Sequence, residues 1–200
     1  MLFYNSRPIA INQKEINNLK TLSGTAIFVD IVGSTALKVA NPQRWIILIG
    51  NTLNYISQIN VIFRDHLVKI IGDELMIFIP DKVLKNENFF TIIDLLKTSM
   101  EELPDNKDLK LATKAAINYC ECVFPISFIQ QKLDYYGKEI DLTARLLTKA
   151  EPNQIIISEK FYTKLNDLEL DNFQNIENVC QESFKGFATP IKYRRILLEC

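Results

Sequence analysis

Two aspartates stand at the ends of apolar segments, in positions suited to holding a cation. Asp30 closes the run AIFVD, and Asp73 follows Gly72 in KIIGDELMIF. If these runs form neighbouring strands, both carboxylates meet at one end of the sheet and repel each other unless cations lie between them. The pattern therefore predicts Mg²⁺ or Mn²⁺ there. Two ordinary readings stay open: Asp30 caps a turn, and Gly-Asp is a common hairpin turn.

The loop after Asp30 adds groups that suit a phosphate. Gly33 allows a sharp turn and close approach of the backbone, whose N–H groups can meet phosphate oxygens. Ser34 and Thr35 add hydroxyls beside the possible cation site. Four of the six glycines lie at such junctions beside an acid or a lysine, namely Gly33, Gly72, Gly137 and Gly186. Together they indicate a phosphate or nucleotide site, and a pair of metal ions there would suit phosphoryl transfer.

Apolar periodicity predicts the elements that place these residues. Strands are expected at 25–31, 66–71, 75–79, 154–158, 180–184 and 191–198, with one long strand or a pair of strands in 109–130. Helices are expected at 42–58, with Asn41 as N-cap and Pro42 as first residue, at 89–103, which Pro104 stops, and at 138–149. This order predicts an α+β domain with helices on one face of a mainly antiparallel sheet.

Composition excludes several classes of protein. The 200 residues suit one domain, expected over 1–200 with a core over about 22–199. A net charge of −1 without a basic stripe disfavours a nucleic-acid partner. No apolar run is long enough for a signal peptide or a membrane span, so we expect a cytoplasmic protein with no membrane partner. The C-x-C pair of Cys120 and Cys122 lacks the second pair that a zinc site needs.

Three segments resemble the signature segments of class III adenylate and guanylate cyclases. They are FVDIVGSTAL, VKIIGDELMIF and DYYGKEIDLTARL, in the family's order and over most of the chain. The resemblance implies a ferredoxin-like α+β catalytic domain that closes a nucleoside triphosphate into a 3′,5′-cyclic monophosphate and releases pyrophosphate. It also implies two Mg²⁺ or Mn²⁺ ions per site, held by Asp30, Asp73 and the backbone carbonyl of Ile31.

The same resemblance assigns a pair of residues to the base. Lys69 and Asp134 match the base-reading positions in their adenine-selective form. A lysine in such a strand is often only an exposed edge residue. If it points into a pocket, it can donate to a ring nitrogen of adenine while Asp134 accepts from the exocyclic amine.

Two further positions match residues that hold phosphate in the family. Arg145 matches the arginine that stabilises charge on the transferring phosphate, a task that suits its fork of donors, although a solvated helix residue is the plain alternative. Lys185, in SFKG, matches a lysine for the terminal phosphates. Because the family takes its metal ligands and its base and arginine positions from different subunits, the resemblance implies a head-to-tail homodimer with two composite sites. A separate effector that binds the cyclic nucleotide is expected downstream.

Two departures from the family pattern leave the base open. Asp141 stands where the family usually has an asparagine that orients the ribose, and AINYCECVF lacks the usual glycines. ATP is favoured, yet the chain also resembles the bacterial pyrimidine cyclases of antiphage defence, which make cyclic UMP or cyclic CMP. One other class is an inert nucleotide-binding module, although degenerate cyclase-like domains commonly lose a metal carboxylate or the arginine and this chain keeps Asp30, Asp73 and Arg145. Another is a polymerase-type palm, which would give a linear or two-base product.

Overall fold

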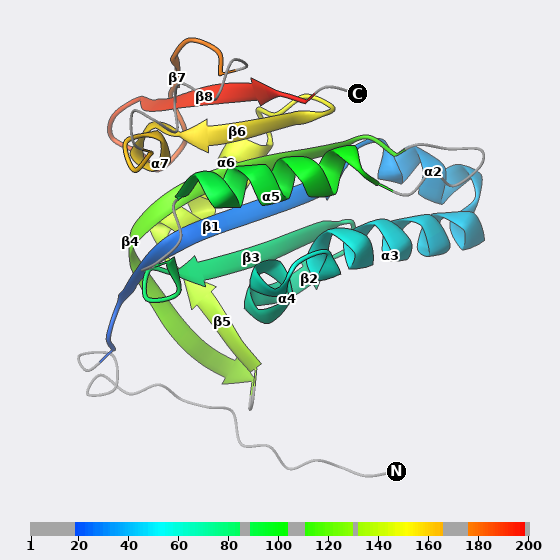
Figure 1. Cartoon of the computed structure of the whole chain (residues 1–200), viewed down its shortest axis with the longest axis horizontal. Helices are drawn as coiled ribbons and strands as arrows, with labels where there is room; N and C mark the ends of the chain where they lie inside the picture. Colours follow the sequence, from blue (N-terminus) through cyan, green and yellow to red (C-terminus); the bar gives the residue numbers. More distant parts are fainter. Residues whose placement is uncertain (1–18, 85–88, 104–110, 130–131, 166–175, 199–200) are drawn as a thin grey trace.

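The computed structural model describes residues 19–84, 89–103, 111–129, 132–165 and 176–198 (Figure 1). The strands in these residues are β1 (Leu22–Ile31), β2 (Leu67–Ile71), β3 (Glu74–Pro80), β4 (Thr113–Ile129), β5 (Lys132–Tyr136), β6 (Gln154–Ser158), β7 (Cys180–Glu182) and β8 (Ile191–Leu197). The helices are α2 (Ser34–Ala40), α3 (Pro42–Gln58), α4 (Val61–His66), α5 (Phe89–Glu101), α6 (Lys138–Leu147) and α7 (Glu159–Tyr162).

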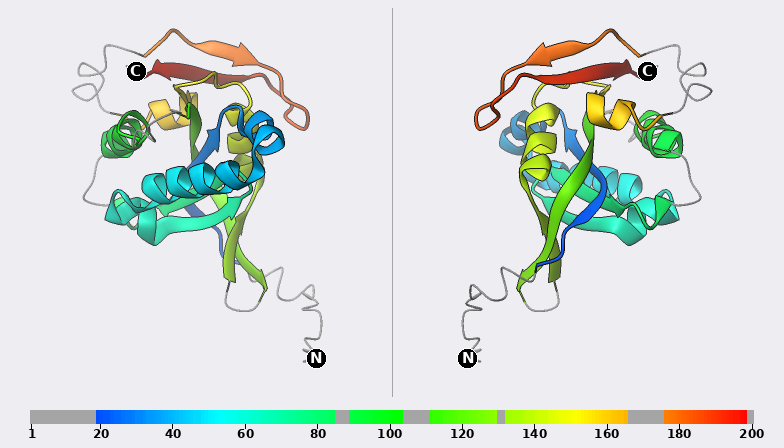
Figure 2. Two further views of the ribbon diagram at one scale, coloured as in Figure 1. Left: turned by 90° about the vertical axis from the view of Figure 1, so that its right-hand side faces the viewer. Right: turned by 90° about the vertical axis from the view of Figure 1, so that its left-hand side faces the viewer.

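The strands form one twisted sheet in the order β2-β3-β1-β4-β6-β8-β7, with β5 paired to β4. Every pairing is antiparallel except that of β4 with β6. The long β4 continues past β1 and forms with β5 a hairpin that projects from the body of the molecule (Figure 2). The predicted α+β class with a mainly antiparallel sheet is thereby confirmed.

Helices cover both faces of the sheet, which corrects the expectation of a single covered face. Residues such as Ile27 of β1 pack with α3, α4 and α5 in one core, and residues such as Phe28 pack with α6 in the other. Figure 2 shows the sheet between these two layers. The central strands are apolar on both sides, and successive side chains point to opposite faces, so each face needs its own cover.

Most predicted elements are present, and two have the predicted bounds, α3 and β6. The start of α3 is as expected: Pro42 is its first residue and the Asn41 side chain accepts a hydrogen bond from the backbone N–H of Arg44 at 3.0 Å. The helix from Phe89 ends at Glu101, and the predicted stop at Pro104 lies outside the described residues. No helix in the described ranges is both long and apolar enough to cross a membrane.

A buried carboxylate attaches α6 to β4. Glu139 is only 6% exposed, and its Oε2 accepts the backbone N–H groups of Glu121 at 2.7 Å and Cys122 at 3.0 Å. Its Oε1 accepts from Lys160 Nζ at 2.7 Å. Burial alone would raise the pKa of Glu139, but these hydrogen bonds outweigh burial and lower it. The start of α6 is therefore fixed by a charged, fully paired group.

Replacing this carboxylate should loosen the attachment of α6. We expect Glu139→Gln to lower the free energy of unfolding at neutral pH by about 1.5–3 kcal/mol, since charge-assisted hydrogen bonds are lost. Because the folded-state pKa of Glu139 lies below its ordinary 4.5, its contribution is present above about pH 4.5 and disappears as the pH falls through the folded-state value. Urea unfolding across this range should show the two proteins converging in acid.

The control for this prediction is Glu102→Gln, at an exposed position after α5. It should unfold like the unmodified chain at every pH. An equal loss in both variants, or a Glu139→Gln loss that persists unchanged in acid, would show that the carboxylate does not stabilise α6.

Candidate active site

The end of β1 gathers charged side chains from three strands. Asp30 is in register with Glu74 on β3 and with Lys114 on β4. Cross-strand partners project to the same face of a sheet, so these three side chains meet. Lys114 Nζ lies 3.3 Å from Asp30 Oδ2. Asp73, in the turn before Glu74, accepts a hydrogen bond from the Ser34 hydroxyl. The structure thus brings Asp30 and Asp73 to one end of the sheet, where we refer to Asp30, Asp73 and Glu74 as the acidic cluster.

The acidic cluster carries more negative charge than its surroundings neutralise. Burial raises the pKa of Asp30, Lys114 partly offsets this, and the charge of Asp73 raises it again. The pKa of Glu74 rises to about 6, first through burial and then through the charges of Asp30 and Asp73. Such mutual repulsion marks a position where a cation would be stabilised.

The backbone around the cluster turns sharply at two glycines. Gly33 has φ 74° and Gly72 has φ 66°, in the left-handed region that glycine enters freely. Between Asp30 and α2, Ile31 is buried and its N–H donates to the Asp30 carboxylate. Ser34 is buried and bonded to Asp73, whereas Thr35 is exposed. The loop therefore turns back beside the carboxylates and leaves its outer side open.

The donors in this region suit a hard divalent cation. Mg²⁺ and Mn²⁺ prefer oxygen ligands, and Mg²⁺ is usually held by one or two carboxylates while substrate phosphates and water complete its shell. Asp30, Asp73 and the carbonyl of Ile31 offer this kind of partial set. Within the described residues, no group of three or more His, Cys, Asp or Glu side chains is arranged to hold an ion by itself. The residues fit a cation that binds together with a phosphate ligand.

A second polar group joins β2 to β5. Lys69 Nζ donates to Asp134 Oδ2 at 2.6 Å, in an ion pair whose two side chains are 24% and 17% exposed. Tyr136 donates its hydroxyl to the same oxygen at 3.1 Å, and the Tyr135 N–H donates to Oδ1 at 2.8 Å. Burial would raise the pKa of Asp134, but the hydrogen bond from Lys69 and the others lower it. The predicted base-reading residues thus lie in contact, joined by a charge-assisted hydrogen bond.

Both groups lie on the face of the sheet that α6 covers. Lys69 is in register with Met76, which belongs to the α6-side core, and Glu74 is two residues before Met76 on the same strand. Lys69 is close enough for its charge to oppose the rise in the pKa of Glu74. The acidic cluster lies at the end of β1 and the start of β3, and the Lys69–Asp134 pair joins β2 to β5. The two groups are therefore neighbours on one face of the sheet.

The other predicted residues lie apart from these groups. Asp141 and Arg145 are four residues apart on α6, away from its buried stripe, with Asp141 exposed and Arg145 half-buried. Lys185 is exposed in the loop between β7 and β8, which packs on the α6 side through Phe184. In the described part of the chain, none of the three forms an ion pair. The structure does not join them to the acidic cluster of the same protomer.

Sequence reasoning overlooked Glu74 and Lys114. Glu74 directly follows Asp73, so a third acid beside the expected pair was visible as a motif GDE. Lys114 is distant from Asp30 along the chain, and only the pairing of β1 with β4 brings the two together.

Comparison with known proteins agrees with this architecture. The family model described as "Adenylate and Guanylate cyclase catalytic domain" matches residues 19–193. Among curated proteins, no sequence matches this chain.

Solved cyclase structures share the fold at low sequence identity. The guanylyl cyclase Cya2 superposes with a TM-score of 0.74 at 16% identity, over 89% of this chain and 93% of that one. The adenylyl cyclase CyaB from P. aeruginosa gives 0.71 at 20% identity, over 92% and 97%. An adenylate cyclase from Trypanosoma brucei, in its monomeric state, gives 0.68 at 19% identity, over 87% and 89%.

These identities establish a common fold, while the family match spans nearly the whole chain from residue 19 to residue 193. On that match, the chain belongs to the family of adenylate and guanylate cyclase catalytic domains and is a nucleotide cyclase.

Proposed function

We propose that the chain converts a nucleoside triphosphate, ATP in preference, to the 3′,5′-cyclic monophosphate and pyrophosphate in a homodimer. The observation that carries this proposal is the arrangement of the acidic cluster beside the Lys69–Asp134 pair on one face of the sheet. The first group suits a cation and a triphosphate, and the second suits the edge of a base.

The Lys69–Asp134 pair offers one donor and one acceptor side by side. Adenine presents the complement, a ring nitrogen that accepts and an exocyclic amine that donates. The base would take the place of the direct 2.6 Å contact, so that neither charged group is left unpaired on binding. Guanine and uracil present the opposite pattern and would leave both groups unpaired, which supports discrimination against them.

Cytosine is the second base that this pair could accept. Its N3 accepts and its amine donates, in the same order as on adenine. Of the two pyrimidine products, cyclic CMP is therefore compatible with the Lys69–Asp134 pair, whereas the pair disfavours uracil and hence cyclic UMP. Ring size, rather than the hydrogen-bond pattern, would have to separate ATP from CTP.

The acidic cluster would hold the triphosphate end of the substrate. Mg²⁺ or Mn²⁺, bound by Asp30, Asp73 and the Ile31 carbonyl, would neutralise phosphate charge and make the ribose 3′-hydroxyl more acidic. Lys114 Nζ lies 3.3 Å from Asp30 Oδ2 and balances its charge. When Asp30 binds a cation instead, the ammonium group of Lys114 would be able to bind a phosphate oxygen. The backbone N–H groups at Gly33, with Ser34 and Thr35, border the same space.

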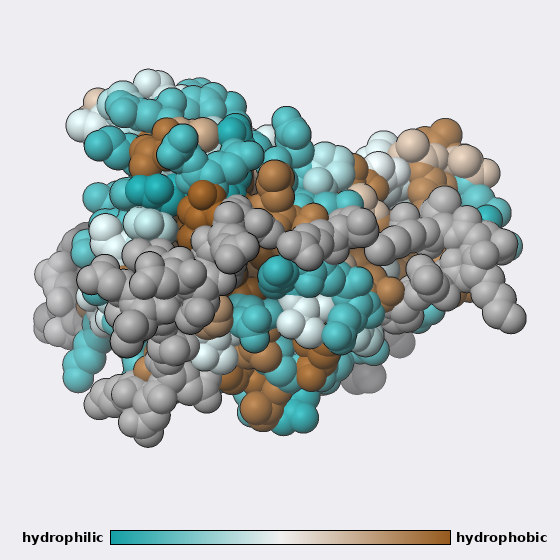
Figure 3. All heavy atoms as spheres, turned by 45° about the horizontal axis from the view of Figure 1, so that its top comes forward, coloured by the Kyte–Doolittle hydropathy of each residue, from teal (hydrophilic) through white to brown (hydrophobic). Residues whose placement is uncertain are grey.

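A second copy would complete the site. Arg145, Asp141 and Lys185 are needed for phosphate and ribose but lie apart from the acidic cluster of their own protomer. The helices next to the cluster expose large apolar side chains: Val39 is 81% exposed, Ile46 63% and Ile47 62%. Figure 3 shows hydrophobic atoms gathered at the end of the molecule where α2 lies. Because α2 begins at Ser34, a copy that covers this surface would approach the acidic cluster directly.

Removing the carboxylates should abolish turnover without unfolding the chain. We expect Asp30→Asn and Asp73→Asn each to lower the rate of cyclic nucleotide formation by about 10²-fold or more, through lost electrostatic stabilisation. Their amides keep the shape of the side chain, so circular dichroism should be unchanged. Asp94→Asn, an exposed aspartate on α5, is the matched control and should keep full activity. Full activity in Asp30→Asn/Asp73→Asn would exclude a metal-dependent reaction at this cluster.

Mixing two inactive variants tests whether the site is shared between copies. One variant would be Asp30→Asn/Asp73→Asn and the other Arg145→Ala. In a head-to-tail heterodimer, one of the two sites receives intact carboxylates from one copy and intact Arg145 from the other. Random exchange should therefore restore about a quarter of normal activity. Failure to recover any activity, with exchange of subunits verified by mass spectrometry, would place the whole site in one protomer.

A further inference from the structure

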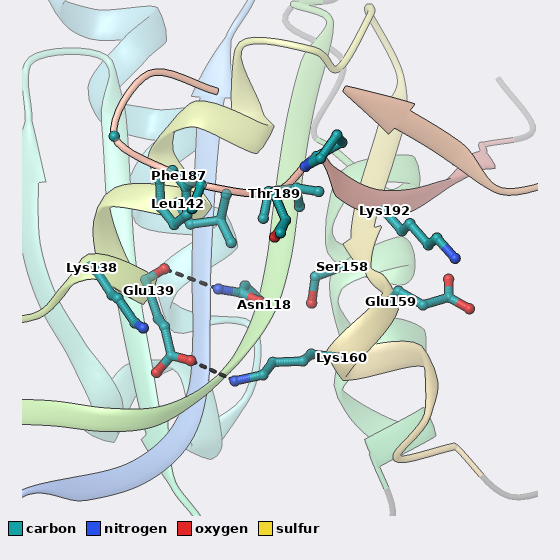
Figure 4. Close-up of a pocket in the computed structure, with 14 residues that line it drawn as sticks. Asn118, Lys138, Glu139, Leu142, Ser158, Glu159, Lys160, Phe187, Thr189 and Lys192 are labelled. Atoms are coloured by element: carbon teal, nitrogen blue, oxygen red, sulfur yellow. Dashed lines mark hydrogen bonds and ion pairs between the residues drawn. The ribbon is translucent and has the colours of Figure 1, made fainter. Parts of the chain in front are cut away.

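A pocket lies beside the start of α6, away from the acidic cluster and from the Lys69–Asp134 pair. Its volume is about 530 Å³, within the range of small-molecule sites. Its walls come from the start of α6, the junction of β6 with α7, the middle of β4 and the loop between β7 and β8. Figure 4 shows these elements converging around the side chains of Asn118, Ser158 and Thr189. Of the residues predicted from the sequence for a nucleotide site, Gly186 lines this pocket, whereas the acidic cluster, Lys69, Asp134, Asp141, Arg145 and Lys185 do not.

The pocket contains a buried hydrogen-bond acceptor, Asn118 Oδ1, that no described group pairs with. Asn118 is 1% exposed, and its Nδ2 donates to the backbone carbonyl of Glu139 at 3.0 Å (Figure 4). Its Oδ1 is buried and has no hydrogen-bond partner in the described part of the chain. An unpaired buried acceptor of this kind destabilises the folded chain, and a ligand N–H that donates to it would recover the missing hydrogen bond. The position therefore calls for a hydrogen-bond donor.

The border of the pocket is cationic and its lining is partly apolar. Lys138 and Lys192 are exposed at its edge, and neither forms an ion pair with another described residue. The other charges there already neutralise one another, since Lys160 pairs with Glu139 and Arg194 with Glu159. Leu142, Phe187, Pro190 and Ile191 supply apolar surface. The pocket thus combines two unpaired cations, an apolar wall and a buried acceptor.

We infer that this pocket binds a nucleoside monophosphate whose base carries an amino group. The amine donates to Asn118 Oδ1, the flat base lies against the apolar wall, and the phosphate is held by Lys138 or Lys192. Phosphate and lysine form the charge-assisted contact, and the planar base suits the aromatic ring of Phe187. The walls belong to α6 and to the loop that carries Lys185, so the bound nucleotide contacts both elements that bear the predicted phosphate-binding residues.

The test uses AMP as the probe, titrated into the full chain while the methyl groups of Leu142, Ala188, Thr189 and Ile191 are followed by NMR. Metal ions and triphosphate are left out, so cyclase activity plays no part in the result. We expect these methyl signals to shift saturably. The double variant Lys138→Gln/Lys192→Gln should raise the dissociation constant about tenfold or more, and Lys82→Gln, an exposed lysine elsewhere, should leave it unchanged.

A change in the ligand tests the role of Asn118 without disturbing the fold. Purine riboside 5′-monophosphate lacks the amine of AMP and should bind about tenfold more weakly, because Oδ1 then stays unpaired. Inorganic phosphate alone should not reproduce the shifts. The inference is overturned if the pocket methyls do not respond to AMP, if phosphate alone binds equally well, or if the shifts instead appear at Val68 and Ile70 and disappear in Lys69→Gln.

Discussion

The position of β1 between β3 and β4 is the constraint on which the candidate site depends. One register places Asp30 opposite Glu74 on one side and opposite Lys114 on the other. A slip of one residue in either pairing would turn Asp30 to the opposite, apolar face, where an unpaired charge is costly. The central strands hold this register because β1 has buried side chains on both faces. Ile27 and Val29 are buried on one face, and their neighbours in the chain are buried on the other. The apolar core thus fixes where the charges lie.

The charges in turn determine how the site can respond to a substrate. The two lysines beside the acidic cluster and in the base-reading pair are each balanced by an acid, Lys114 by Asp30 and Lys69 by Asp134. When a nucleoside triphosphate binds with its cations, Asp30 would contact a cation and Lys114 a phosphate oxygen. Lys69 and Asp134 would contact the edge of the base, so that binding leaves no charge unpaired. The acidic cluster nevertheless remains the region of excess negative charge, because Asp73 and Glu74 add to Asp30. This excess is the physical reason to place the cations there.

The residues with a local signal could be predicted from the sequence. The Gly-Asp turn, the buried strand before Asp30 and the capped helix after Asn41 each follow from short-range chemistry, and the structure has them. The short α2, α4 and α7 were overlooked, since helices of seven, six and four residues carry too little periodicity. Strand β5, with Asp134 and two tyrosines, lacks an apolar run of its own and forms only by pairing with β4.

Contacts between distant segments were beyond the reach of sequence patterns. Lys114 could not be connected with Asp30 before the β1–β4 register was known, and α6 was expected on the same face as the other helices. The polar pocket beside α6 depends on β4, α6, α7 and the β7–β8 loop together. None of these segments alone has a sequence motif that predicts the pocket. What the family resemblance added was the roles of Lys69, Asp134 and Arg145, which remain predictions.

The most direct measurement is a competition among the four triphosphates. The purified chain would be incubated with equal concentrations of ATP, GTP, CTP and UTP and with Mn²⁺, and the products would be separated by mass spectrometry. We expect cyclic AMP as the main product, with cyclic CMP as the only other product that the Lys69–Asp134 pattern admits. Cyclic UMP or cyclic GMP as the main product, or no cyclic product at any protein concentration, would contradict this expectation.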